Sequence, residues 1–259
     1  FKKSLGQNCL VDKNIINKIT SIENIKNKSI FEIGPGSGNL TESIISKKPK
    51  RIDIIEKDQR FCEILKERFR LIKELKIINK DILKYDLSNY KFNDAVVFGN
   101  LPYNISTQIL SKFISILYWP PFYSRIIFMF QKEVAERILA KENTKQYGRI
   151  SILTNLKLDL INQFDISRKC FFPEPKVDSK IIVFKPKIKI NYKISNIRSL
   201  ETVTHTFFSG KRKMINKAFS KLFCNHLEIA KKLKINLNLR PSELTCSDYY
   251  RITELYEKQ

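Results

Sequence analysis

Short apolar stretches alternate with amphipathic ones between residues 29 and 184, and no other feature of the chain restricts its fold so strongly. The amphipathic stretches at 60–70 and 107–117 have helical spacing, and a further helix is predicted at 150–158. The apolar stretches are short enough to be strands. Strands that alternate with helices form a mostly parallel sheet covered on both faces, so an α/β fold is expected. The predicted strands are 29–33, 51–55, 76–78, 94–98, 124–130, 160–165 and 180–185.

A basic segment broken by proline, at 185–193, separates this region from the rest of the chain. Beyond it, the spacing of apolar residues predicts four helices, at 197–208, 211–222, 227–233 and 248–257. We therefore expect two domains, one over 1–185 and a small helical one over 186–259.

The charge of the chain indicates the kind of partner. Its 259 residues include 48 Lys and Arg against 26 Asp and Glu, which gives a net charge of +22. A surplus of this size is typical of proteins that bind RNA or DNA. A genome rich in A and T would explain why Lys outnumbers Arg, but not why basic residues nearly double acidic ones. A nucleic-acid partner is therefore predicted.

Several classes of protein do not fit the sequence. No apolar run approaches the roughly 18 residues of a membrane-spanning helix, so no membrane partner is expected. The five cysteines are scattered and form no CxxC pair, which indicates a reducing compartment and no structural zinc. The two histidines, His205 and His226, have no ligand cluster around them, so no metal site is expected.

A glycine-rich turn follows the first predicted strand, in the order Gly34, Gly36, Gly38. Such glycines let the backbone pass close to a ligand that lies over a helix N-terminus, at the carboxyl end of a parallel sheet. The spacing differs from the dinucleotide fingerprint, because the third glycine comes one residue early and Asn39 takes its place. Gly34 and Gly36 are candidate cofactor contacts.

Two acidic residues follow the next two predicted strands. Glu56 ends the second strand, about twenty residues past the glycines, where a carboxylate can accept both hydroxyls of a ribose. Asp81 follows the third strand and could accept the exocyclic amine of an adenine. Surface loop carboxylates are common, but three matched strand ends in chain order favour a nucleoside-like cofactor.

The fourth predicted strand ends in Asn100-Leu101-Pro102-Tyr103, and here the chain resembles methyltransferases that act on the amine of adenine. Specifically, it is similar to the KsgA-type rRNA adenine dimethyltransferases. The resemblance covers nearly the whole chain, through segments 5–10, 32–38, 131–137, 147–149, 171–179, 212–214 and 239–241. It departs from the family at Cys9, where Phe is usual.

This resemblance implies a class I, Rossmann-like methyltransferase domain with seven strands, and S-adenosylmethionine as cofactor. Adenine N6 is a poor nucleophile because its lone pair is delocalised, so Asn100 and the Leu101 carbonyl would accept its two hydrogens and orient it. Pro102 sets the turn. Tyr103 and Phe171 would stack on the two faces of a base taken out of its helix.

The resemblance also implies further contacts. Asn8 and the Leu10 backbone would touch the methionine part of the cofactor, beside Asn100. Arg149 and Lys176 would hold RNA phosphates. The run Lys211-Arg212-Lys213 is predicted to open a helix, where three cations oppose the dipole, so a phosphate contact is the better explanation.

The expected activity is N6,N6-dimethylation of two adjacent adenosines near the 3′ end of 16S rRNA, on an immature small subunit, by a monomeric cytoplasmic enzyme. An organellar matrix is the alternative compartment if a targeting segment was trimmed. Two rival functions share parts of the pattern: a large-subunit rRNA methylase of the macrolide-resistance type, and a non-catalytic assembly or transcription factor on the same fold.

Overall fold

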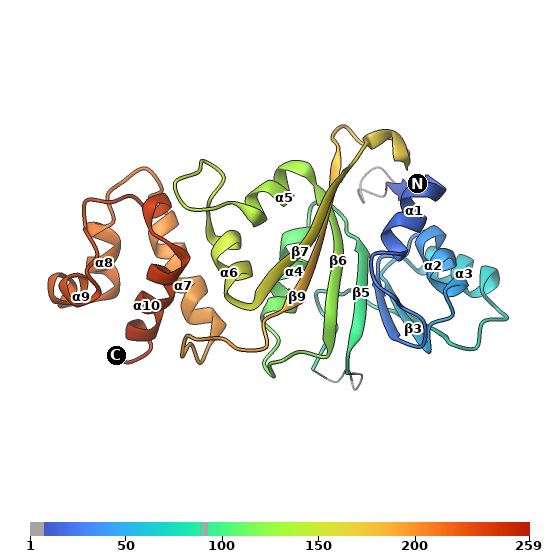
Figure 1. Cartoon of the computed structure of the whole chain (residues 1–259), viewed down its shortest axis with the longest axis horizontal. Coiled ribbons are helices and arrows are strands. Elements are labelled where there is room, and N and C mark those ends of the chain that lie inside the picture. Colours follow the sequence, from blue (N-terminus) through green and yellow to red (C-terminus); the bar gives the residue numbers. More distant parts are fainter. Residues whose placement is uncertain (1–7, 89, 91–92) are drawn as a thin grey trace. The chain divides into compact units, whose positions relative to one another are not determined.

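The computed structural model describes residues 8–88, 90 and 93–259 (Figure 1). The chain forms two compact units. The first contains the residues up to Ala135 together with Asp159–Pro186, and the second contains Glu136–Leu158 and Lys187–Gln259.

The first unit is built on a seven-stranded sheet, and the predicted α/β class is confirmed. Its strand order is β4-β3-β2-β5-β6-β9-β7. The pairs that join β4 through β6 are parallel, whereas β9 runs antiparallel to β6. All seven predicted strands exist, as β2 (Ser29–Ile33), β3 (Arg51–Glu56), β4 (Leu75–Asn79), β5 (Ala95–Asn100), β6 (Tyr123–Gln131), β7 (Leu158–Ile166) and β9 (Ser179–Pro186).

The central strands are buried on both faces, as their uninterrupted apolar sequences require. Residues 95–98 of β5 are fully buried. The helices of this unit are α1 (Lys13–Thr20), α2 (Asn39–Ser46), α3 (Gln59–Arg68) and α4 (Ser106–Ile114). The helix α5 (Lys132–Leu139) begins in this unit, and its residues from Glu136 onward belong to the second. Two of these helices begin at aspartates that cap free amides. Asp12 accepts from Ile15 N at 3.0 Å, and Asp58 accepts from Arg60 N at 3.0 Å.

A second, two-stranded sheet was not predicted. The short strands β1 (Cys9–Leu10) and β8 (Phe171–Phe172) pair antiparallel, with Cys9 opposite Phe172 and Leu10 opposite Phe171. The pairing continues where the amide of Val11 donates to the Cys170 carbonyl at 2.9 Å. It fastens the segment before α1 to the chain 160 residues later.

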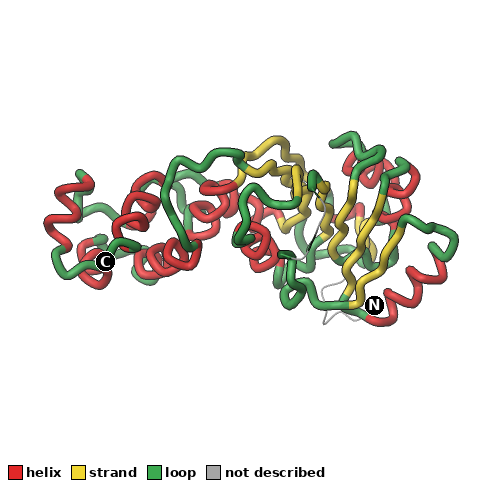
Figure 2. The backbone as a smooth tube through the Cα atoms, turned by 90° about the horizontal axis from the view of Figure 1, so that it is seen from below, coloured by secondary structure: helices red, strands yellow, loops and turns green. Residues whose placement is uncertain are grey.

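The second unit contains the helices α6 (Arg149–Lys157), α7 (Ile197–Phe208), α8 (Asn216–Leu222), α9 (His226–Leu233) and α10 (Cys246–Tyr256). Figure 2 shows the helices and loops in red and green. Thr245 and Asp248 form a capping box at the start of α10. The sequence placed 136–158 in the first domain. In the structure α6 belongs to the helical unit, because Ile152, Leu153 and Leu156 share a core with α7.

The helix predicted from residue 211 begins only at Asn216, so this prediction was wrong by five residues. Lys213 N closes a turn on the Gly210 carbonyl at 2.8 Å. The amides of Ile215 and Asn216 donate to carbonyls of the 237–239 segment, at 2.8 and 3.2 Å. The chain therefore cannot turn into a helix earlier, and the helix-dipole argument for the 211–213 run does not apply.

Gly38, the last glycine of the turn after β2, tests how the first unit packs. Gly38 has φ +85°, and a Cβ there would lie 2.8 Å from side-chain atoms of both Leu65 and Phe69. Gly38→Ala should therefore lower the free energy of unfolding by about 2–3 kcal/mol, through backbone strain and overpacking. Urea denaturation measures the change.

Gly210→Ala is the matched control. Its φ is not positive, and the nearest atom to an added Cβ is 3.7 Å away. Its stability should stay within about 1 kcal/mol of the parent. Equal losses in the two variants would contradict the packing argument.

Candidate functional site

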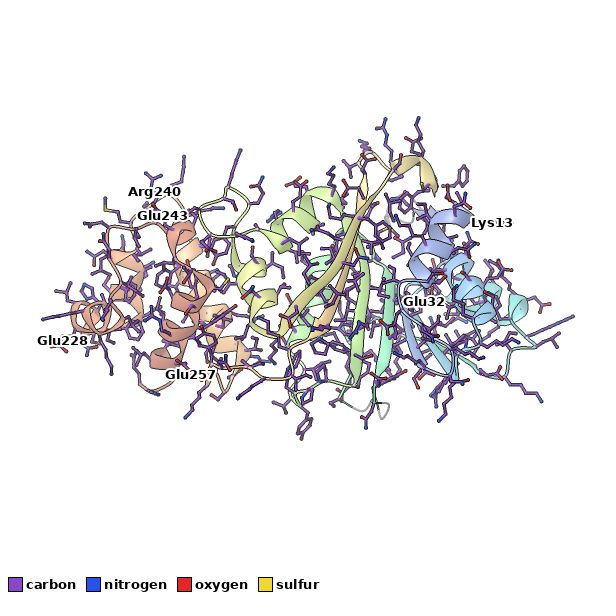
Figure 3. All side chains as sticks on the ribbon, viewed as in Figure 1. Lys13, Glu32, Glu228, Arg240, Glu243 and Glu257 are labelled. Atoms are coloured by element: carbon purple, nitrogen blue, oxygen red, sulfur yellow. The ribbon has the colours of Figure 1, made fainter. Side chains whose placement is uncertain are left out.

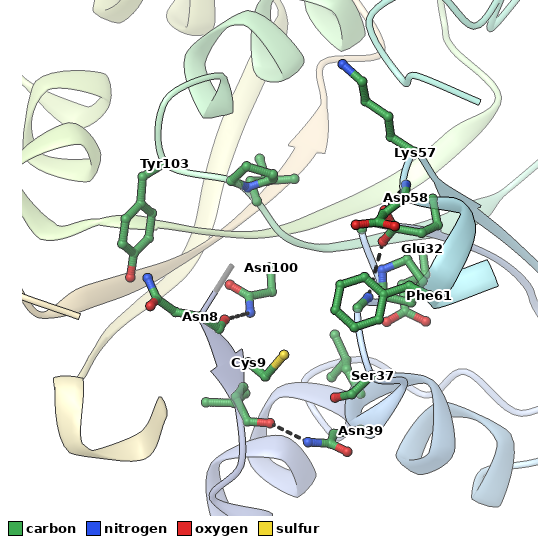
Figure 4. A pocket seen from close by; sticks show the side chains of 18 of the residues that line it. Asn8, Cys9, Glu32, Ser37, Asn39, Lys57, Asp58, Phe61, Asn100 and Tyr103 are labelled. Atoms are coloured by element: carbon green, nitrogen blue, oxygen red, sulfur yellow. Dashed lines mark hydrogen bonds between the residues drawn. The ribbon is translucent and has the colours of Figure 1, made fainter. Parts of the chain in front are cut away.

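A cavity of about 390 Å³ lies at the carboxyl ends of β2, β3 and β5 (Figure 4). Parallel pairing puts these strand ends side by side, which is where ligands bind in open α/β sheets. Four segments line it: 8–10, the glycine turn with the start of α2, the end of β3 with the start of α3, and 100–105. Most of the predicted cofactor and base contacts are therefore brought together: Asn8, Leu10, Gly34, Gly36, Glu56, Asn100, Leu101, Pro102 and Tyr103.

The glycine turn needs glycine for its backbone conformation. Gly34 and Gly36 have φ values of +63° and +57°, which side chains disfavour. An added Cβ at Gly36 would meet only the Cys9 thiol, at 3.6 Å. Conformation, rather than crowding, is the reason for glycine at these two positions, and the main chain remains open to the cavity.

The Glu56 carboxylate joins the ends of two strands. Its Oε2 accepts from Gly36 N at 3.4 Å, and its Oε1 accepts from Asp58 N at 2.8 Å. Burial raises the pKa of this carboxyl, and the bonds from the backbone amides oppose that rise. Glu56 lines the cavity, and each of its carboxylate oxygens can accept a further hydrogen bond.

A second carboxyl, that of Glu32 on β2 (Figure 3), also lines the cavity. It is 1% exposed, and its Oε2 accepts from the Thr41 hydroxyl at 2.7 Å. Burial raises the pKa of Glu32 to about 8, with a smaller contribution from the charge of Glu56. The cavity therefore holds one carboxyl that favours its neutral form at pH 7.

The Asn100 amide is oriented by the main chain of the first strand. Its Nδ2 donates to the Asn8 carbonyl at 3.0 Å (Figure 4). Because the nitrogen is engaged there, Oδ1 is the atom left to act as an acceptor. Tyr103 is held in a similar way: its hydroxyl lies 2.9 Å from the Ser179 hydroxyl on β9, and burial raises its pKa.

Two predicted site residues do not line this cavity. Asp81 accepts from Lys57 Nζ and from Leu83 N, both at 2.9 Å, and the bond from Lys57 lowers the pKa of Asp81. Phe171 is 3% exposed and packs in the hydrophobic core. The neighbouring Phe172, which was not predicted to contact a base, is the exposed ring of the two, at 62%.

The predicted RNA-contacting residues lie in both units. Lys176 is exposed in the first unit, and Arg149 is exposed at the start of α6 in the second. Lys211 is only half-buried, and its Nζ donates to the Lys145 and Tyr147 carbonyls at 2.7 and 2.9 Å. Its neighbours Arg212 and Lys213 are exposed.

Several lining residues were not predicted. Asn39 fastens the first strand, because its Nδ2 donates to the Leu10 carbonyl at 3.0 Å (Figure 4). Its position in place of a third glycine was the one available signal. Phe61 was assigned only to a helix face, although it contributes an aromatic wall. Lys57 and Asp58 follow Glu56 directly and also line the cavity. Loop residues that follow a strand often form part of a binding site, so their position was a signal.

The described part of the chain has neither a metal-binding cluster nor a membrane-spanning helix. No group of three or more His, Cys, Asp or Glu residues there has an arrangement that could hold a metal ion. None of the helices formed by the described residues combines the length and apolar character needed to cross a membrane. The five cysteines are free thiols.

The sheet order, the antiparallel β9 and the cavity over the glycine turn define a class I methyltransferase fold. A model of the family "Ribosomal RNA adenine dimethylase" matches residues 1–258. The chain belongs to this family, and it is an S-adenosylmethionine-dependent rRNA adenine dimethyltransferase.

Individual relatives agree with this assignment. Ribosomal RNA small subunit methyltransferase A of Pelagibacter ubique is 47% identical over 99% of this chain and 97% of its own length. The Wolbachia enzyme of the same name is 36% identical, covering 96% and 90%. The crystal structure of a dimethyladenosine transferase from Plasmodium falciparum superposes with a TM-score of 0.77 at 27% identity, covering 96% and 97%.

The raised pKa of Glu32 predicts how stability changes with pH. Between pH 4.5 and about 8 the folded protein holds a proton that the unfolded chain releases. The contribution of this group to stability is therefore complete at low pH and declines as the pH rises toward 8. The free energy of unfolding of the parent, minus that of Glu32→Gln, should fall between about pH 4.5 and pH 8 and level off above that. Urea titrations at several pH values test this, and a constant difference would contradict it.

Proposed function

We propose that this enzyme places two methyl groups on N6 of each of two adjacent adenosines near the 3′ end of small-subunit rRNA. The observation that carries the proposal is a single cavity lined by the glycine turn, by Glu56 and by Asn100 to Tyr103. One wall suits a nucleoside cofactor, and the other suits an exocyclic amine. The relatives named as small-subunit methyltransferases support the choice of RNA.

The residues present fit S-adenosylmethionine. Glu56 keeps acceptor capacity toward a ribose, and the positive φ values of Gly34 and Gly36 bring main chain close to the ligand. Asn8 and Leu10 also line the cavity, where their main-chain carbonyls accept from the side-chain amides of Asn100 and Asn39. When bound, this cofactor supplies an electrophilic methyl group on a positively charged sulfur. Asp81 can take part in binding an adenine only if it gives up its bond to Lys57.

The protein's contribution at the target amine is to align it for methyl transfer. Asn100 Oδ1 and the Leu101 carbonyl accept the two N6 hydrogens, which turns the nitrogen lone pair away from the ring and toward the cofactor side of the cavity. No strong base is needed, because the proton leaves after the nitrogen has become cationic. Positioning and local electrostatics provide most of the acceleration.

Stacking holds the base once it has left its helix. Tyr103 lines the cavity with its hydroxyl fixed on Ser179, so one face of the base has a ready partner. Phe171 can serve the second face only if the β1–β8 pair opens, because its ring is now buried.

Basic residues away from the cavity would dock the RNA. Arg149, Lys176, Arg212 and Lys213 are exposed and suited to phosphate contacts. Lys211 contributes less, because two carbonyls already engage its ammonium group. We place this reaction in a monomeric enzyme acting on immature subunits in the cytoplasm, with an organellar matrix as the alternative compartment.

The two rival functions are less well supported. The structure of the 23S rRNA methyltransferase ErmE superposes with a TM-score of 0.67 at 19% identity, covering 96% and 99%, so the likeness concerns the fold alone. A non-catalytic factor would not need Glu56 and Asn100 at one cavity. Transfer of labelled methyl groups to immature small subunits, with the modified adenosines mapped, decides among the three. Labelling of large-subunit RNA alone, or no transfer, would overturn the proposal.

Glu56 provides a test of cofactor binding. Glu56→Ala should weaken S-adenosylmethionine binding by about 1.5–3 kcal/mol, the range for hydrogen bonds to charged groups. Calorimetry on the folded variant measures this. Because Glu56 also accepts from Gly36 and Asp58, Glu56→Gln is the appropriate partner variant: it keeps an acceptor oxygen and should lose less. Unchanged affinity in Glu56→Ala would remove this residue from the site.

Asn100 separates chemistry from docking. Asn100→Ala should slow single-turnover methyl transfer by at least about a hundredfold, the effect of removing one positioned hydrogen bond in a transition state. Subunit affinity should stay within a few-fold, because the basic surface is intact. The variant also loses the bond from Asn100 to the Asn8 carbonyl, and a parallel measurement of cofactor affinity shows whether that loss affects cofactor binding. A normal transfer rate with lost subunit binding would instead make Asn100 a docking residue.

A further inference from the structure

A second cavity lies at the opposite edge of the same sheet. It has a volume of about 400 Å³ and is lined by residues 50–51, which lead into β3, and 73–76, which lead into β4. The register Ile52–Leu75 and the bond from Ile52 N to the Glu74 carbonyl, at 2.9 Å, hold these two segments together. We call this the amino-edge cleft, defined by Lys50, Arg51, Lys73, Glu74, Leu75 and Lys76.

The amino-edge cleft is strongly basic. Its cations are Lys50, Arg51, Lys73 and Lys76, against one carboxylate, Glu74. Arg51 is neutralised in part, since its Nε donates to the nearly buried Asp53 at 2.9 Å. The three lysines are exposed, and among the described residues no carboxylate lies within salt-bridge distance of them. Their charge therefore faces solvent without a partner in this unit.

The main chain of the cleft is held in place, so its charged side chains start from fixed positions. Lys50 N donates to the Lys28 carbonyl at 2.9 Å, which fixes the chain just before β3. Holding several like charges in one cleft is unfavourable unless a polyanion or its counterions offset their repulsion. Lysine ammonium groups on flexible stems suit a row of phosphates, rather than one anion held in a fixed geometry.

The cleft cannot bind the nucleotide that enters the catalytic cavity. Arg51 and Glu56 are the two ends of β3, and five residue steps of a strand separate them by about 17 Å. A phosphate group in the cleft therefore belongs to another stretch of RNA than the adenosine at Asn100. Because the cleft and the catalytic cavity lie at opposite ends of β3, RNA that fills both must pass around the unit, and a folded subunit can do so with two separate segments.

We propose that the amino-edge cleft binds the phosphate backbone of a second RNA segment of the small subunit, through Lys50, Lys73 and Lys76. This inference rests on the proposed function for its substrate. It assigns to the catalytic unit a docking site of its own, on the edge of the sheet away from the chemistry.

The test replaces the three lysines by glutamine, as K50Q/K73Q/K76Q. For immature small subunits, the log–log salt slope of binding should fall by about 2–3 units, because three phosphate contacts are lost. Methylation of a short hairpin that carries the two adenosines should keep its rate, and cofactor affinity should not change. The arginine variant K50R/K73R/K76R keeps the charges and should restore the slope.

Lysines elsewhere in the first unit provide the control. Lys13 and Lys66 are exposed on α1 and α3, outside the cleft, and K13Q/K66Q removes charge without touching it. If K13Q/K66Q lowers the salt slope by the same amount per charge removed, the lysines act only through general electrostatic attraction, and the proposal is overturned. Normal binding of protein-free 16S rRNA with weakened subunit binding would identify an acidic protein instead, which also overturns it.

The outcomes keep the two proposals apart. If the parent enzyme fails to methylate immature subunits, the proposed function fails. If it methylates them and K50Q/K73Q/K76Q binds with an unchanged salt slope, only the amino-edge cleft is wrong.

Discussion

The parallel pairing of β2 with both β3 and β5 is the constraint on which the rest of this molecule depends. It brings three strand ends to one edge, and each end contributes one part of the cavity: a glycine turn, a carboxylate and an amide. None of the three could act alone, because each is anchored through its neighbours. Gly34 N bonds to the Ile55 carbonyl at 2.9 Å, and Glu56 holds the amide of Gly36. The geometry of the site therefore depends on the register in which β2 pairs with β3 and β5.

A second set of contacts orients the reactive groups. The Asn8 carbonyl selects which end of the Asn100 amide is available, and Ser179 on β9 fixes the Tyr103 hydroxyl. These partners lie 92 and 76 residues away along the chain, so the site depends on the complete first unit. Such partners make alignment possible before any ligand arrives, which suits a reaction in which positioning does most of the work.

Much of this was predictable from the sequence, for physical reasons that differ by element. Buried strands such as β5 have uninterrupted apolar sequences, and Gly34, Glu56 and Asn100 stand where those strands end. The two-residue strands β1 and β8 are too short to show any period. The engagement of Asp81 by Lys57, and of Lys211 by two carbonyls, depends on contacts that a one-dimensional pattern does not encode. The sequence placed α6 in the first domain, because its apolar residues do not mark a single face and so give no pattern that shows which core they join.

The hydrogen bonds that hold the segment 8–11 beside the cavity all use its main chain. The Asn8 carbonyl accepts from Asn100, the Leu10 carbonyl accepts from Asn39, and Val11 N donates to the Cys170 carbonyl. None of these bonds uses the side chain of Cys9, although this thiol lines the cavity beside Gly36. A substitution at residue 9 would therefore reshape the cavity wall without removing any bond that holds the segment in place.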